Sequence, residues 1–227
     1  MNGNIRLIGI LAMVLLVATV QMAGAESQDW RLLGEDHDYE GKEAVDGSMP
    51  HCIDCNMSKT ENTTKSRKDL SNDETAWWYA ESPAQFDGLT FGEGDWTVEI
   101  DHAQYAGYTI FANVCKVNDT TGEVTYLANG SESANSSGTT TITCTDVGDT
   151  DQVFNTTDRL ALRIYHDRSD DLRIYYYKPT SHHSRLTSPS SDPGYPVPEL
   201  PTIILTATGI LVLAGYASLR RSRKTDK

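Results

Sequence analysis

The feature that most constrains the fold is a succession of short runs rich in Val, Ile, Thr, Tyr and Trp between Asp29 and Tyr177. Clusters of Gly, Asn, Asp and Ser separate these runs, as turns do in β-rich proteins. No window holds a long apolar period of 3.6 residues, so helices should be minor here. The pattern predicts strands near Trp30–Leu33, Thr75–Ala80, Asp95–Asp101, Tyr108–Val117, Glu123–Ala128, Thr139–Thr145, Asp158–His166 and Asp171–Lys178.

Strands of this length with polar turns favour an all-β fold, a single antiparallel β-sandwich of jelly-roll or immunoglobulin-like type. We expect this extracellular domain to span residues 26–180. Residues 36–73 are polar and have the weakest pattern, so a long loop is predicted there.

The clearest alternation lies in the last two predicted strands, which the turn 167–171 joins as a hairpin. One face is expected to be apolar and to carry Leu160, Leu162, Ile164, Leu172, Ile174 and Tyr176. The other face carries Arg163, Tyr165, Arg173, Tyr175 and Tyr177. Tyrosine and arginine side chains can stack on sugar rings, which makes this stripe a candidate glycan-binding platform. The simpler interpretation is ordinary cross-strand pairing with cation–π contacts.

Two apolar segments frame this domain. Arg6, the apolar run Leu7–Val20 and the small-residue triplet that ends at Ala25 match a secretory signal peptide over residues 1–25, handled by the secretion machinery. Cleavage after Ala25 is favoured over an uncleaved anchor, because a bilayer core needs roughly 20 apolar residues.

The second segment, Thr202–Leu219, has 18 uncharged residues and predicts a transmembrane helix. A basic cytoplasmic tail, residues 220–227, follows and orients the helix with the domain outside. The stop-transfer residues are Arg220, Arg221, Arg223 and Lys224. Residues 181–201 are rich in Pro and Ser and should form an extended tether.

The end of this tether resembles a known sorting signal. The motif Val197, Pro198, Glu199, Leu200 and Pro201, then the apolar span and the basic tail, is similar to the archaeal PEF-CTERM signal and to its bacterial relative, PEP-CTERM. The resemblance covers about 30 residues; Leu200 departs from the Phe of the archaeal consensus and the Pro of the bacterial one. It implies a small archaeal surface protein, cut near Glu199 by an archaeosortase-like enzyme and joined there to a lipid or another envelope component. The apolar segment would then act as a targeting signal that is removed, and not as a permanent membrane anchor.

The charge distribution agrees with export. The net charge of −13 argues against binding of nucleic acid, which requires a basic face. Residues 26–200 carry −18 and residues 220–227 carry +4. Six of the ten asparagines lie in N-x-S/T sequons, which predicts a glycoprotein. They are Asn56, Asn62, Asn118, Asn129, Asn135 and Asn155.

Four cysteines outside the cytoplasm can form two disulfides. A Cys115–Cys144 bridge would join two predicted strands and stabilise the fold by about 3–4 kcal/mol in the chain-entropy model. Cys52 and Cys55 form a C-x-x-C motif with three interpretations: a redox motif, half of a zinc site, or a local disulfide. The oxidising compartment favours the local disulfide.

No sequence motif indicates catalysis: G-x-S-x-G, H-E-x-x-H and the P-loop are absent. We therefore expect no catalytic residue, metal site or cofactor, although acid clusters leave room for structural Ca²⁺. These clusters are Asp36/Asp38/Glu40, Asp146/Asp149/Asp151 and Asp167/Asp170/Asp171.

The preferred hypothesis is a non-enzymatic adhesion or structural module at the cell surface, whose partners are the membrane, glycans or other surface proteins. The alternative is a small secreted hydrolase with a carboxylate pair, such as a glycosidase.

Overall fold

A computed structural model of the chain describes residues 26–36, 45, 51–59, 67–103, 107–148, 152–176 and 184–195. They belong to a compact unit that spans Ala25–Val197; residues 1–24 and 198–227 lie outside the described residues. The strands are β1 (Asp29–Asp36), β2 (His51–Ser58), β3 (Arg67–Leu70), β4 (Thr75–Ala80), β5 (Leu89–Thr90), β6 (Trp96–His102), β7 (Tyr108–Asn118), β8 (Val124–Ala134), β9 (Gly138–Asp146), β10 (Val153–Phe154), β11 (Asp158–His166), β12 (Leu172–Tyr175) and β13 (Arg185–Thr187).

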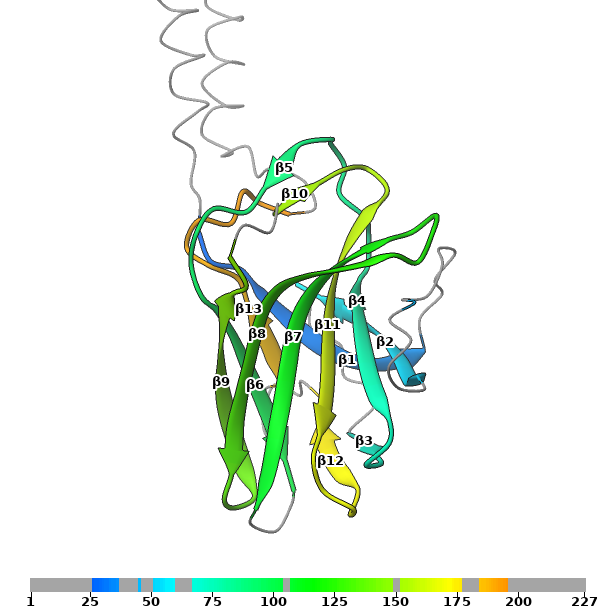
Figure 1. The fold of residues 1–227 in the computed structure, drawn as a ribbon, viewed down its shortest axis with the longest axis vertical. Coiled ribbons are helices and arrows are strands. Elements are labelled where there is room, and N and C mark those ends of the chain that lie inside the picture. Colours follow the sequence, from blue (N-terminus) through cyan, green and yellow to red (C-terminus); the bar gives the residue numbers. More distant parts are fainter. Residues whose placement is uncertain are drawn as a thin grey trace, which may run out of the picture. The chain divides into compact units, whose positions relative to one another are not determined.

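Nine strands hydrogen-bond edge to edge in a closed barrel, in the order β13–β1–β2–β4–β11–β7–β8–β9–β6 and back to β13 (Figure 1). Neighbouring strands are antiparallel except β2 and β4, which are parallel. β12 pairs with the end of β6 beyond β13 and carries β3 on its other edge. β5 and β10 form a separate two-stranded ribbon.

The prediction of a two-sheet sandwich was wrong, because β13 pairs on both sides and closes the sheet into a barrel. Its residues pair with Asp29–Arg31 of β1 on one side and with Thr97–Glu99 of β6 on the other. This pairing joins the first strand of the barrel to β6 and leaves neither with an open edge at the seam. β13 lies in the segment that was predicted to be a tether.

The long loop predicted over residues 36–73 contains two strands. β2 lies between β1 and β4, and its Cys55 and Met57 are fully buried in the core. β3 pairs with β12. Val45 lies between β1 and β2 in the sequence. It donates its backbone N–H to the carbonyl of Gly122 in the β7–β8 turn, at 2.8 Å.

The alternation predicted for β11 and β12 is confirmed, but the hairpin is not. All six residues of the predicted apolar face are buried in one core cluster. However, β11 pairs with β4 and β7, so both of its edges are occupied. β12 therefore pairs with β3 and β6 instead.

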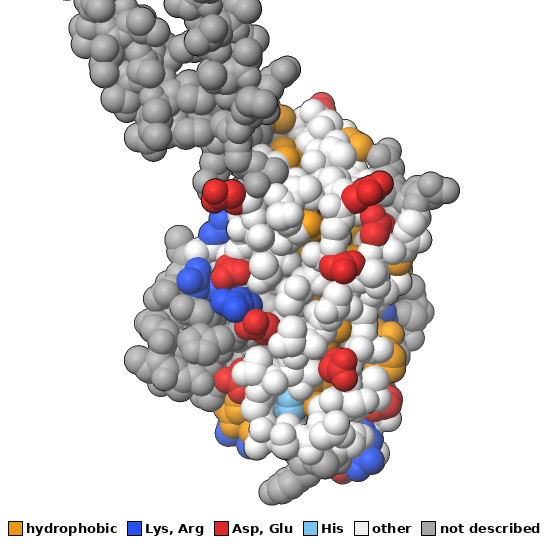
Figure 2. Space-filling view, turned by 90° about the vertical axis from the view of Figure 1, so that its left-hand side faces the viewer, with side chains coloured by type: hydrophobic (Ala, Val, Ile, Leu, Met, Phe, Trp, Pro, Cys, Tyr) orange, Lys and Arg blue, Asp and Glu red, His pale blue; other side chains and the backbone are white. Residues whose placement is uncertain are grey.

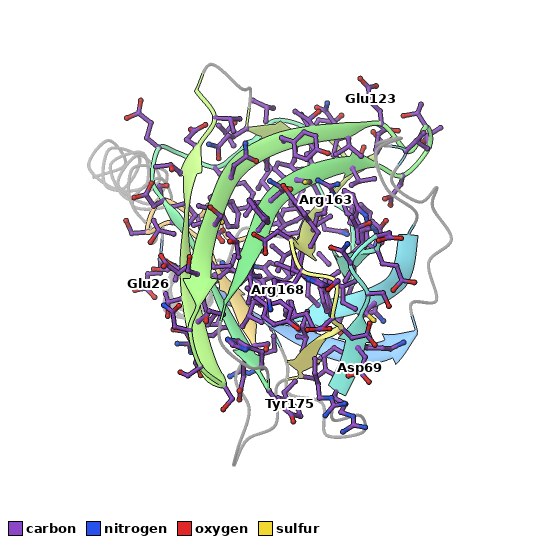
Figure 3. All side chains as sticks on the ribbon, turned by 60° about the horizontal axis from the view of Figure 1, so that its bottom comes forward. Glu26, Asp69, Glu123, Arg163, Arg168 and Tyr175 are labelled. Carbon is purple, nitrogen blue, oxygen red and sulfur yellow. The ribbon has the colours of Figure 1, made fainter. Side chains whose placement is uncertain are left out.

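The core has two parts that lie on opposite faces of β4. The larger cluster contains Trp78, Trp96 and Tyr195. Figure 3 shows that side chains fill the inside of the barrel. A smaller cluster on the other face contains Trp77, Tyr79, Cys115, Val117 and Ala161. This arrangement explains why every residue of β4 is buried.

The predicted transmembrane helix has no counterpart in the part of the chain that the structure describes, where no helix is long and apolar enough to cross a bilayer. The segment for which it was predicted, Thr202–Leu219, lies outside that part. Figure 2 shows the side of the unit that lies at the left of Figure 1, where uncharged polar groups predominate and acidic side chains are scattered. Four exposed threonines of β9 belong to the polar surface: Thr139, Thr141, Thr143 and Thr145.

Candidate functional site

The stripe predicted to bind glycans is divided between two places in the structure. Arg163 and Tyr165 lie on β11, whereas Arg173 and Tyr175 lie on β12, which does not pair with β11. Figure 3 shows Arg163 and Tyr175 well separated. Tyr177 lies outside the described residues. The stripe is therefore two separate groups, and each has its own surroundings.

The first group, which we name the β12 patch, consists of Arg67, Asp69, Asp101, Arg173 and Tyr175. Arg173 Nε donates to Asp69 Oδ1 at 2.8 Å, and this bond raises the pKa of the guanidinium. The half-buried Tyr175 pairs in register with Arg67 of β3 and with Asp101 of β6. The patch thus presents an aromatic ring between charged donors and acceptors, a combination that can contact a sugar through both its apolar face and its hydroxyls.

The second group lies on β11, β7 and β8 and contains a row of hydrogen-bonded side chains that we name the amide ladder: Arg163, Asn113 and Asn129. Arg163 Nη1 donates to Asn113 Oδ1 at 3.1 Å, and Asn113 Nδ2 donates to Asn129 Oδ1 at 2.8 Å. These residues face each other in register across the three strands.

An aromatic pair lies beside the ladder. Tyr165 stacks on Phe111 with ring centroids 4.7 Å apart and planes inclined by 6°. The guanidinium of Arg163 lies over the Tyr165 ring at 4.7 Å. Both rings are half-buried. Sequence reasoning identified Arg163 and Tyr165 but missed Phe111 and Asn113, although their place at alternate positions of β7, between buried Ile110, Ala112 and Val114, was a signal for this face.

The six predicted glycosylation sites differ in accessibility. Asn129, Asn135 and Asn155 are exposed, Asn56 is half-buried, and Asn62 lies outside the described residues. Asn118 is half-buried, and its amide is fully engaged in the β7–β8 turn. Its Nδ2 donates to Thr157 and Asp158, while its Oδ1 accepts the backbone N–H groups of Thr120 and Thr121. A glycan on Asn118 Nδ2 would replace one of its hydrogens and so remove a hydrogen bond to Thr157 or Asp158.

The predicted disulfides are contradicted. Cys55, Cys115 and Cys144 are buried thiols that form no disulfide. Cys115 lies in the smaller apolar cluster and Cys144 in the larger one, so the sheet separates them. Burial raises the pKa of Cys144 to about 12, with a smaller contribution from Asp95. The C-x-x-C motif lies on a strand rather than in a tight turn, and the side chain of Cys52 is outside the described residues.

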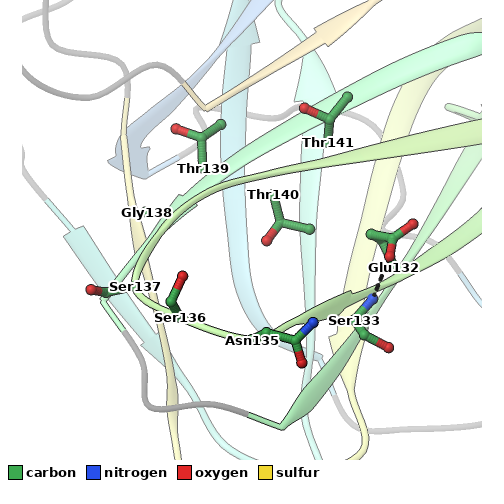
Figure 4. Close-up of a pocket in the computed structure, with 9 residues that line it drawn as sticks. All are labelled: Glu132, Ser133, Asn135, Ser136, Ser137, Gly138, Thr139, Thr140 and Thr141. Atoms are coloured by element: carbon green, nitrogen blue, oxygen red, sulfur yellow. Dashed lines mark hydrogen bonds between the residues drawn. The ribbon is translucent and has the colours of Figure 1, made fainter.

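Two polar hollows offer little for a carboxylate-pair hydrolase. One, of about 330 Å³, lies along the β8–β9 hairpin, and Glu132 is its single acidic residue (Figure 4). The other, of about 240 Å³, contains Glu123 and Asp158. Both oxygens of Asp158 already accept hydrogen bonds, from Asn118 Nδ2 and from the backbone of Asn155. Asp158 therefore stabilises the turn that begins at Asn155 and its contact with Asn118.

A buried histidine lies behind the first hollow. His102 Nε2 lies 2.8 Å from Thr140 Oγ1, while its Nδ1 is buried and makes no hydrogen bond. Burial lowers the pKa of His102, and Asp101 partly opposes this shift. A hydroxyl–imidazole pair can support nucleophilic catalysis, but the base then needs a third group that orients it. Because Nδ1 makes no hydrogen bond to the described residues, none of them orients His102 in this way.

Acidic groups that could bind Ca²⁺ are instead used in turns. Asp146 accepts from Gly148 and Gln152, Asp167 from the backbone of Thr109, and Asp171 from Ser71. Among the described residues no group of three His, Cys, Asp or Glu side chains could hold a metal ion. The side chains of Asp36, Asp38, Glu40, Asp149 and Asp151 are not among those described.

Residues 184–195, which we name the C-terminal strap, pack against the barrel rather than extend from it. Arg185 forms ion pairs with Asp29 at 3.1 Å and with Glu99 at 3.0 Å, one on each side of β13. Asp192 Oδ1 accepts the backbone N–H groups of Gly194 and Tyr195. Burial raises the pKa of Asp192, and these two hydrogen bonds partly oppose the shift.

Tyr195 anchors the end of the strap. Its ring contacts Trp30, Phe91 and Phe154 at centroid distances of 5.5, 6.0 and 5.3 Å. Its hydroxyl donates to the carbonyl of Ser82 and accepts from the backbone N–H of Leu160. Sequence reasoning missed this role, because the proline-rich composition obscured a lone aromatic residue.

The residues predicted for processing lie outside the described part of the chain. They are Ala25, the sorting motif Val197, Pro198, Glu199, Leu200 and Pro201, and the stop-transfer residues Arg220, Arg221, Arg223 and Lys224.

Comparisons with known proteins add little. No protein-family model matches the chain, and no curated protein matches it. Among solved structures, the chain is similar to a CocE/NonD family hydrolase from Staphylococcus aureus, with 10% identity and a TM-score of 0.46. The match covers 72% of this chain and 36% of that enzyme, so the chain spans about a third of the enzyme's length. This likeness is too distant to assign an activity.

Proposed function

We propose that this protein is an exported, non-enzymatic surface protein that displays one compact β-domain outside the cell and is processed at both ends. The observation that carries the proposal is the extent of the compact unit, Ala25–Val197. The predicted signal-peptide cleavage follows Ala25, and the predicted sorting motif begins at Val197. The two expected processing points therefore flank the folded body and remove none of its described strands.

The C-terminal strap strengthens this proposal. The buried ring of Tyr195 lies only four residues before Glu199, near which cleavage is expected. A cut at Glu199 leaves the strap intact, whereas a cut before Tyr195 would remove a buried side chain from the core. A sorting signal placed directly after the last anchored residue suits an enzyme that must join a folded domain to the envelope.

The β12 patch is the part of this surface that we assign to contact with glycans or other surface proteins. It combines Tyr175 with the charged groups Arg67, Asp69, Asp101 and Arg173, and Arg173 and Asp69 are exposed at 39% and 42% of their side chains. Accessible polar groups around an aromatic ring can exchange their water for sugar hydroxyls at modest cost.

The mass of the protein purified from its native envelope tests processing. We expect an N-terminus at Glu26 and loss of the Thr202–Lys227 tail. A full-length mass would refute the proposal. Glycan-array binding tests the contact role: Tyr175→Ala should abolish binding, and Thr141→Ala, at an exposed position of β9, should leave it unchanged. Absence of binding by the wild-type protein would refute the contact with glycans without affecting the proposed display.

A further inference from the structure

We propose that Asn129 carries an N-linked glycan and that the first sugar packs on the Phe111–Tyr165 pair of its own protein. This inference rests on the proposed export of the domain. It contrasts Asn129 with the sequon at Asn118 and gives the aromatic pair a ligand that is covalently attached to the neighbouring strand.

The amide ladder fixes the orientation of Asn129. A guanidinium only donates hydrogen bonds, so the atom of Asn113 that faces Arg163 Nη1 must be its oxygen, at 3.1 Å. Asn113 therefore turns its Nδ2 toward Asn129, where it donates to Oδ1 at 2.8 Å. The orientation of both amides thus follows from Arg163, whose charge is permanent. Asn129 Nδ2, the atom that a glycan would modify, points away from the ladder.

The surroundings of Asn129 leave space for a sugar. Asn129 and Ser131, the first and third residues of the sequon, are both exposed and lie on the same face of β8. Gly130 lies between them on the other face, where a Cβ atom would approach the carbonyl oxygen of Thr143 to 2.4 Å. The close contact between β8 and β9 at Gly130 is therefore on the face opposite to the side chains of Asn129 and Ser131.

The aromatic pair lies within reach of that sugar. Phe111 pairs in register with Ser131, one step along the face from the Asn113–Asn129 pair. Diagonal neighbours in antiparallel strands are about 7–8 Å apart, roughly the length of one sugar ring and its linkage. Phe111 is held rigidly by its stack on Tyr165. A sugar on Asn129 can thus lay its apolar C–H face on a ring that is already ordered, which limits the loss of conformational entropy.

The bond formed is that between Asn129 Nδ2 and the anomeric carbon of an oligosaccharide carried on a lipid phosphate. The bond between this carbon and the phosphate oxygen breaks, the lipid phosphate leaves with the electron pair, and the amide nitrogen gives one proton to the transferase. Asn118 provides the contrast, because its Nδ2 already donates to Thr157 and Asp158, while its Oδ1 accepts from the backbone of Thr120 and Thr121.

Glycopeptide mapping of the native protein tests the site. We expect a glycan on Asn129 and none on Asn118. An unmodified Asn129 in a chain that begins at Glu26 would overturn this inference and leave the proposed export standing. A modified Asn118 would also overturn it, because the argument from the engaged amide would then fail. A chain that keeps residues 1–25 and carries no glycan would overturn both proposals.

The packing of the sugar is tested by a double-mutant cycle on the native protein. Ser131→Ala destroys the sequon and keeps the Asn113–Asn129 bond, so it is a matched aglycosylated control. We expect Phe111→Ala to lower the melting temperature by about 2–4 °C more in the glycosylated background than in the Ser131→Ala background. Equal losses in the two backgrounds would refute contact between the sugar and Phe111.

Discussion

Removal of the Tyr195 hydroxyl tests whether the C-terminal strap is part of the fold. In Tyr195→Phe the ring stays in its aromatic pocket, but two backbone groups lose their partners: the half-buried carbonyl of Ser82, at 2.9 Å, and the buried N–H of Leu160, at 3.0 Å. Burial raises the pKa of Tyr195, so the hydroxyl remains a donor throughout the working range of pH. Each buried group left unsatisfied costs about 1–3 kcal/mol, so we expect a loss of about 2–4 kcal/mol.

For a compact unit of this size, such a loss lowers the melting temperature by about 6–12 °C. Differential scanning calorimetry of the processed protein measures it, and Thr141→Val, which removes an exposed hydroxyl, should shift the transition by less than about 2 °C. Tyr195→Ala should be more destabilising, because it also removes a buried ring. If Tyr195→Phe melts within 1 °C of the wild type, the two hydrogen bonds of the Tyr195 hydroxyl do not stabilise the fold and this reasoning is refuted.

Three further predictions concern other parts of the fold. Gly130→Ala should lower the free energy of unfolding by about 1–3 kcal/mol in urea titrations, because its Cβ would meet Thr143 at 2.4 Å. His102 has a lowered pKa in the folded state, so its stabilisation is present above pH 6.5 and is lost as the pH falls through that value toward the folded pKa; His102→Gln should flatten this step in melting curves from pH 7.5 to 5. Cys144, whose pKa is raised to about 12, should react with a thiol reagent only after denaturation, and reducing agent should leave the melting temperature unchanged.

β4 and β11 could be predicted from the sequence because both are rich in apolar residues, and they are buried along most of their length. The predicted bounds of both strands are confirmed. β2 could not be predicted in this way. Half of its residues are polar and they do not alternate strictly with apolar ones, and its inclusion depends on pairing with β1 and with the parallel strand β4, which local pattern does not encode.

Part of the candidate site could be predicted from the alternation of side chains along β11 and β12. Alternation placed Arg163 and Tyr165 on one face, and Arg173 and Tyr175 on one face, correctly. Their division into two groups depends on strand order, because β11 already has β4 and β7 as neighbours. Cysteine pairing failed similarly, since Cys115 and Cys144 occupy opposite sides of a sheet whose topology the spacing does not reveal.

The closure of the barrel depends on contacts between residues that lie far apart in the sequence. Thr187 Oγ1 donates to Asp29 Oδ1 across 158 positions, and β13 contributes only three residues to the seam. Three residue pairs with β1 and three with β6 are a small gain against the entropy of closing so long a loop, so we expect side chains to contribute much of the stabilisation. Arg185 does so by its ion pairs with Asp29 and Glu99, and Tyr195 by its burial. The identity of these two residues, rather than the proline-rich composition around them, determines whether the seam closes.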